Sequence, residues 1–113
     1  MDTLTRYRQI VQEVLEPYTR IEYANADIRN ELVCDKNTDR FLILSMGWGK
    51  VPKGRIHGCL IHIDIIDGKV WIQRDGTEHG VAADLEEAGI PKTDIVLGFH
   101  APRLRPYTDY AAA

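Results

Sequence analysis

The chain has 113 residues, of which 44% are hydrophobic and 27% charged, and its formal net charge at pH 7 is −3. This composition is that of a folded chain, and the length allows about one domain, so residues 1–113 are expected to form a single unit. The acidic balance argues against a protein whose main task is to bind DNA phosphates. No apolar run approaches the roughly 20 residues that span a bilayer, so we expect a cytoplasmic protein without membrane contact.

The first predicted element is an amphipathic helix from Leu4 to Tyr18. Its apolar residues recur every three or four positions and form one stripe, while charged and glutamine side chains occupy the other face. Asp2 or Thr3 can cap the start of this helix, and Pro17 marks its end. We expect the helix to cover one face of a sheet.

Two strands are predicted next, Glu31–Asp35 and Arg40–Trp48, joined by the turn KNTD. The polar stretch EYANADIRN before them is predicted as a connection. The second strand is largely apolar on both faces, with Phe41, Ile43 and Ser45 on one face and Leu42, Leu44, Met46 and Trp48 on the other. Such a strand belongs inside a sheet that is covered on both sides, either by this chain or by another.

A second hairpin is predicted from Arg55–Ile66 and Lys69–Arg74, around the turn Asp67-Gly68. A two-residue turn fixes which residues lie opposite one another. The expected pairs are Ile65–Val70, Ile63–Ile72 and Ile61–Arg74 on the core face, and Ile66–Lys69, Asp64–Trp71 and His62–Gln73 on the other face.

The last predicted elements are a short helix from Val81 to Ala88, a turn from Pro91, and a strand within Asp94–His100. The order of elements therefore predicts an α+β fold. In this fold the long N-terminal helix packs on a mainly antiparallel sheet of two hairpins, to which a short helix and a short C-terminal strand are added.

Acidic and histidine side chains gather between His62 and Glu78 and raise the question of a metal or catalytic site. His62 and Asp64 point the same way on a strand, but a metal needs three or four converging ligands. Asp67 and Asp75 each precede glycine and are interpreted as turn formers. A metal-dependent nuclease or hydrolase that uses His62, Asp64 and Glu78 is the alternative hypothesis. No complete catalytic constellation is found, so the sequence predicts a protein without enzymatic activity, metal or cofactor.

The two cysteines, Cys34 and Cys59, are predicted to be buried thiols and not a disulfide or a zinc site, since they lie in apolar, strand-like surroundings without a CxxC pair. Alternation along the strand places Cys59 on the core face with Ile61 and Ile63. A thiol buried there is expected to be unreactive.

Two candidate contact surfaces remain. Tryptophan beside a few polar groups is typical of protein interfaces, which predicts a partner-binding face formed by His62, Asp64, Trp71, Gln73 and Trp48. The alternative is that the C-terminal segment covers this face itself. A weaker candidate is a nucleic-acid contact through Lys50, Lys53, Arg55, Arg103 and Arg105.

Three long stretches, LTRYRQIVQEVL, GCLIHIDIIDGKVWIQRDGTE and EAGIPKTDIVLGFHAPRLRPYTDYA, resemble the XisI family, the cyanobacterial fdxN element excision controlling factors. The resemblance implies a small α+β protein, usually encoded beside a XisH protein, that helps control excision of a DNA element by a separate recombinase in differentiating cells. It supplies no catalytic residue. Together with the partner-binding face, it predicts an accessory protein that binds a XisH-type protein and itself, as a homo-oligomer.

Overall fold

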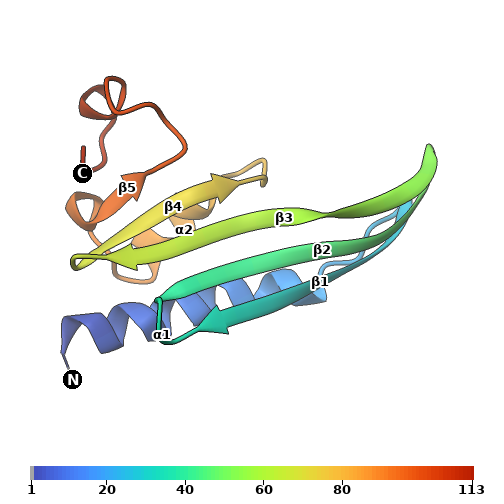
Figure 1. Cartoon of the computed structure of the whole chain (residues 1–113), viewed down its shortest axis with the longest axis horizontal. Coiled ribbons are helices and arrows are strands. Elements are labelled where there is room, and N and C mark those ends of the chain that lie inside the picture. The colour runs from blue at the N-terminus through green and yellow to red at the C-terminus, as the bar shows by residue number, and fades with distance from the viewer. Residues whose placement is uncertain (1) are drawn as a thin grey trace.

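The computed structural model describes residues 2–113 of the chain (Figure 1). The chain begins with helix α1 (Thr3–Leu15) and the 3₁₀ helix η1 (Glu16–Arg20), and then forms four consecutive strands. The strands are β1 (Ala26–Asp35), β2 (Arg40–Lys50), β3 (Lys53–Ile66) and β4 (Lys69–Asp75). After them come α2 (Val81–Glu87), η2 (Lys92–Asp94), β5 (Ile95–Leu97) and η3 (Arg105–Tyr107).

The strands form one sheet in the order β1-β2-β3-β4-β5. The first four strands are antiparallel neighbours, and β5 runs parallel to β4. Parallel neighbours need a crossover connection, and α2 provides it. The prediction of an α+β fold with a mainly antiparallel sheet is therefore confirmed.

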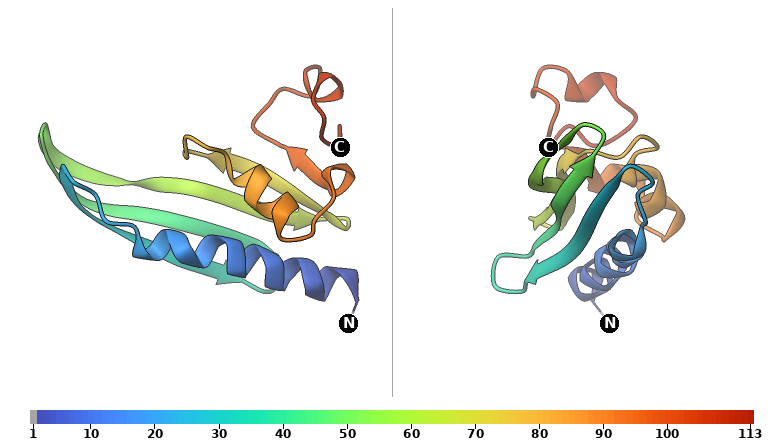
Figure 2. Two further views of the ribbon diagram at one scale, coloured as in Figure 1. Left: turned by 180° about the vertical axis from the view of Figure 1, so that it is seen from behind. Right: turned by 90° about the vertical axis from the view of Figure 1, so that its right-hand side faces the viewer.

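Both α-helices lie on the same face of the sheet (Figure 2, left). The main hydrophobic core lies between these helices and the sheet, and it includes Leu15 of α1, Leu85 of α2, and Ile43, Ile63 and Ile72 of the strands, all fully buried. Figure 1 is viewed from the other side, with the sheet in front of the helices. We call this other side the open face.

The N-terminal helix begins as predicted but ends earlier. The Asp2 carboxylate caps it by accepting a hydrogen bond of 2.7 Å from the Thr5 backbone N–H. The α-helix stops at Leu15, and Pro17 lies in the 3₁₀ turn η1 that follows. Proline lacks the N–H that a continuing α-helix would need. Tyr18 stays buried on the apolar stripe because η1 continues in the same direction.

Strand β1 starts at Ala26 and not at Glu31, so the prediction of a connection through residues 26–30 was wrong. The side chains of these residues do alternate between the two faces of the sheet. However, the inward-facing residue nearest the core is the polar Asn30, which is only 4% exposed. A polar residue on the buried face conceals the period of two on which strand prediction depends. Strands β2 and β3 are also longer than predicted, and only Val51 and Pro52 remain as their turn.

The pairing of β3 with β4 follows the prediction from Ile66–Lys69 to Ile63–Ile72 and then shifts by one residue. His62 lies opposite Arg74, and Ile61 lies opposite Asp75, so the predicted pairs of these two residues were wrong. The shift is a β-bulge that leaves Gln73 as the extra residue in β4.

A second bulge, between β2 and β3, changes the position of Cys59. The pairing passes from Ile43–Ile61 to Leu44–Cys59, which leaves Leu60 as the extra residue. Cys59 is therefore on the open face with Leu44 and not on the core face, and its thiol is half-buried. Burial still raises the pKa of this thiol, as it does for Cys34, so both remain weakly nucleophilic.

The C-terminal elements are close to their predicted positions. Helix α2 ends at Glu87, and Gly89 adopts a positive φ of 117°, as a helix-terminating glycine does. The last strand is shorter than the predicted range and covers Ile95–Leu97. In residues 2–113, none of the helices has the length and apolar character needed to cross a membrane.

Candidate functional site

The open face carries a line of apolar side chains along β2, which we call the apolar row: Leu42, Leu44, Met46 and Trp48. Trp48 is 59% exposed, and Val33 beside Leu42 on β1 is 41% exposed. In the part of the chain that the structure describes, no helix or strand packs over β1–β3 on this side (Figure 1). The central strand is thus apolar on both faces, as predicted, but this chain covers only one of them.

At one end of the apolar row lies a polar group that we call the Asp64 cluster: Arg40, His62, Asp64 and Gln73. Asp64 is only 6% exposed although its side chain lies on the open face. Arg40 Nε donates to its Oδ1 at 3.0 Å, and His62 Nε2 lies 2.9 Å from the same oxygen. Gln73 Nε2 donates to Oδ2 at 3.4 Å. A buried carboxylate needs such hydrogen-bond partners to offset the loss of its hydration.

The structure does not assemble the metal site that His62, Asp64 and Glu78 would form. Glu78 lies in the loop from β4 to α2, which returns to the helix side of the sheet (Figure 2). Both Asp64 oxygens already accept hydrogen bonds from neighbouring side chains. Within residues 2–113 no three His, Cys, Asp or Glu side chains come together in a way that would hold a metal ion.

Trp71 of the predicted partner-binding face is packed within the chain. The Arg105 guanidinium lies 5.1 Å from the centre of its ring, in a cation–π contact. Arg105 is held by hydrogen bonds from Nε to the His100 carbonyl at 3.1 Å and from a terminal nitrogen to the Gly98 carbonyl at 3.4 Å. Val96, next to Trp71, is fully buried. The C-terminal segment thus covers the β4–β5 end of the open face and leaves β1–β3 uncovered.

We predict that Trp71→Ala releases the C-terminal segment and lowers the free energy of unfolding by about 2 kcal/mol, because the ring is the platform for Arg105. Trypsin should then cleave after Arg103 faster than in the wild type, as followed by mass spectrometry. Trp48→Ala removes the same kind of ring from an exposed position and is the matched control. Unchanged cleavage in Trp71→Ala would show that other contacts hold the segment.

The cations predicted to contact nucleic acid fall into two separate places. Lys50, Lys53 and Arg55 lie together at the tip of the β2–β3 hairpin, while the segment with Arg103 and Arg105 lies beside β5 at the other end of the molecule (Figure 1). Lys50 approaches Asp27 at 3.4 Å, and Arg55 lies 5.4 Å from the centre of the Trp48 ring. Contact of the tip with DNA stays a prediction.

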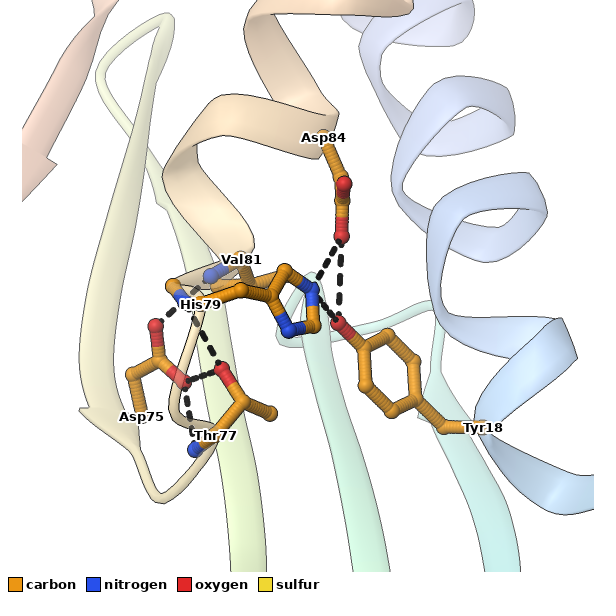
Figure 3. Close-up of polar contacts among 7 residues, drawn as sticks. Tyr18, Asp75, Thr77, His79, Val81 and Asp84 are labelled. Carbon is orange, nitrogen blue, oxygen red and sulfur yellow. Dashed lines mark hydrogen bonds and ion pairs between the residues drawn. The ribbon is translucent and has the colours of Figure 1, made fainter. Parts of the chain in front are cut away.

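A second polar cluster lies on the helix side and joins η1 to α2 (Figure 3). The Tyr18 hydroxyl donates to Asp84 Oδ2 at 3.1 Å and lies 2.9 Å from His79 Nε2, which is itself 3.1 Å from that oxygen. Burial, followed by the hydrogen bond to Asp84, raises the pKa of Tyr18 above its ordinary value. The phenol is thus held as a neutral donor. No local pattern in the sequence predicts this cluster, because 61 positions separate Tyr18 from His79.

Asp75 organises the loop that leads into α2 (Figure 3). One carboxylate oxygen accepts from the Thr77 backbone N–H at 2.9 Å, and the other accepts from the Val81 N–H at 2.7 Å. The Thr77 hydroxyl accepts from the Gly80 N–H at 3.2 Å. Asp75 therefore has the turn-forming role predicted for it, and it also satisfies a donor at the start of α2.

Comparison with known proteins identifies the family. The family model described as XisI protein matches residues 1–112. The chain belongs to the XisI family. A solved structure of a XisI-like protein from Anabaena variabilis is 35% identical, covers 97% of this chain and 99% of its own, and superposes with a TM-score of 0.83. The fdxN element excision controlling factor XisI from the same organism is also 35% identical, covers 99% and 100%, and has a TM-score of 0.79. A search of curated proteins gives no match.

The XisI match spans both the open face and the Tyr18 cluster, since it runs along almost the entire chain. The family resemblance predicted from the sequence is therefore confirmed, and with it the α+β fold. Within residues 2–113, the apolar row remains a surface that no helix or strand covers, with Trp48 exposed and Leu42, Leu44 and Met46 partly exposed.

Proposed function

We propose that this XisI-family chain is a cytoplasmic, non-catalytic accessory protein that helps control DNA element excision by binding a XisH-type protein and itself. The observation that carries the proposal is the uncovered apolar row, in which Trp48 is 59% exposed. Exposed apolar surface of this kind, bordered by polar groups, marks protein contact sites. The relative that is named an excision controlling factor supports the controlling role.

The two polar clusters support a role without catalysis because their hydrogen bonds are used within the chain. In the Asp64 cluster the carboxylate lies between Arg40, His62 and Gln73, and both of its oxygens accept hydrogen bonds from side chains of the same chain. In the other cluster the pKa of Tyr18 is raised, which keeps its phenol protonated. The Asp64 cluster joins β2, β3 and β4 at the open face, and the Tyr18 cluster joins η1 to α2 on the helix side.

Co-expression with a XisH-type protein, followed by size-exclusion chromatography, tests the proposal. The wild-type chain should co-elute with the partner. Leu44→Glu, which places a charge in the middle of the apolar row, should elute alone, since burying an unpaired charge costs several kcal/mol. Circular dichroism of each variant verifies that it is folded.

The matched control is Glu87→Lys, which changes the charge of an exposed residue on the helix side and should leave co-elution intact. A folded Leu44→Glu chain that still co-elutes would place the contact away from the open face. A wild-type chain that never co-elutes would remove the XisH-type partner from the proposal.

A further inference from the structure

The two sides of the apolar row differ in charge. Strand pairing places Asp27, Trp48 and Arg55 in one line across β1, β2 and β3, and Glu31, Leu44 and Cys59 in a second line. The β1 side of each line thus ends in a carboxylate. The β3 side ends in a cation in the first line.

The second line also has a cation on its β3 side. Arg74 of β4 donates from Nε to the Cys59 carbonyl at 2.8 Å, so its guanidinium lies at the level of Glu31 across the row. Between these two lines, Arg29, Met46 and His57 form a third line. The open face therefore has two carboxylates with Arg29 between them on the β1 side, apolar side chains in the centre, and two guanidinium groups with His57 between them on the β3–β4 side.

A surface of this pattern is complementary to itself. A two-fold axis parallel to β2 and lying above it places β1 of one copy over β3 of the other at the same level along the strands. The apolar row then packs against its own copy, while Asp27 faces Arg55 and Glu31 faces Arg74. Between these two charged contacts, Arg29 faces His57. Because the operation is two-fold, each of these contacts occurs twice, as in any isologous interface.

From this arrangement we infer that the open face of the free protein is occupied by a second copy of this chain, in a face-to-face sheet dimer. The inference rests on the proposed function, which takes the open face as a contact surface. It adds that the molecule bound there is a second copy of this chain. The internal ion pairs of the β1 side, Asp27 with Lys50 at 3.4 Å and Glu31 with Arg29 at 2.9 Å, join exposed groups. Such pairs contribute little and can be exchanged for contacts across the interface.

Sedimentation velocity at several protein concentrations and at low ionic strength tests the inference. The wild-type chain should show a monomer–dimer equilibrium that weakens as salt is added. Asp27→Arg and Arg55→Asp, each measured alone, place like charges together twice in every dimer and should each weaken dimerisation about tenfold or more.

Mixing the two variants gives the decisive measurement. In a dimer of one Asp27→Arg chain and one Arg55→Asp chain, both contacts join opposite charges again, so the mixture should dimerise about as well as the wild type. Arg55 also contacts the Trp48 ring within its own chain, but a loss of that internal contact is not restored by mixing. Glu87→Arg, on the helix side, is the matched control and should dimerise normally.

The inference is overturned by a wild-type chain that stays monomeric at every concentration, or by single variants whose mixture remains monomeric. The two experiments distinguish failure of the dimer from failure of the proposed function. A monomeric chain that still co-elutes with a XisH-type protein would leave the proposed function standing, and a dimer that captures no such protein would leave only the inference.

Discussion

The protein should lose stability steeply between pH 10 and pH 12, because buried tyrosines must ionise when the chain unfolds. Burial, followed by the hydrogen bond to Asp94, raises the pKa of Tyr7 to about 12, and burial with the bond to Glu86 does the same for Tyr110. In the unfolded chain both phenols ionise near pH 10. Their contribution to the free energy of unfolding is therefore complete below pH 10 and is lost as pH rises through 12.

The expected effect is large for Tyr7, because this residue is only 2% exposed. A difference of about two pKa units corresponds to about 3 kcal/mol. Urea denaturation, followed by circular dichroism at pH 9, 10, 11 and 12, measures how the free energy of unfolding decreases with pH. This decrease should be smaller in Tyr7→Phe than in the wild type. Tyr107→Phe, at an 89% exposed position, is the matched control and should keep the wild-type slope. Equal slopes in wild type and Tyr7→Phe would contradict the prediction.

Tyr7 also shows which parts of the fold the sequence makes predictable. It belongs to the apolar stripe of α1, whose spacing of three and four residues is long and regular enough to identify the helix. The hairpin around Asp67 and Gly68 was equally clear, because a two-residue turn fixes its own register. Local patterns of this kind predicted the elements and most of their order.

The features that sequence reasoning missed are those set by distant contacts. The bulges at Leu60 and Gln73 have no local turn residue from which they could be predicted. Each bulge moves the side chains beyond it to the face opposite the predicted one. This is why Cys59 was assigned to the core. In the Asp64 cluster, His62 and Gln73 were predicted to share a face with Asp64, but Arg40 comes from the other hairpin. Only the β2–β3 register brings it there.

Asn30→Ala should lower the free energy of unfolding by about 3 kcal/mol, because it removes three hydrogen bonds made by one buried side chain. The Asn30 amide donates to the Tyr18 carbonyl and to the Tyr23 hydroxyl, both at 2.9 Å. Its oxygen accepts from the Ser45 hydroxyl at 2.6 Å. One 4% exposed side chain thus joins η1 and the segment after it to β1 and β2.

The side chains of Glu31 and Leu44, the neighbours of Asn30 and Ser45, point to the open face, so these hydrogen bonds support the contact surface from behind. Ser45→Ala removes only one of them and should cost about 1 kcal/mol. Asn37→Ala, in the exposed β1–β2 turn, is the matched control and should stay within about 0.5 kcal/mol of the wild type. Urea denaturation of the three variants measures their free energies of unfolding, and the loss should be largest in Asn30→Ala and smallest in Asn37→Ala. If Asn30→Ala were no more destabilising than Asn37→Ala, the sheet and η1 would be joined by packing alone. If Asn30→Ala instead lowers the free energy of unfolding well beyond Ser45→Ala, then Asn30 holds the first half of β1 in place. The same polar residue conceals the strand pattern there.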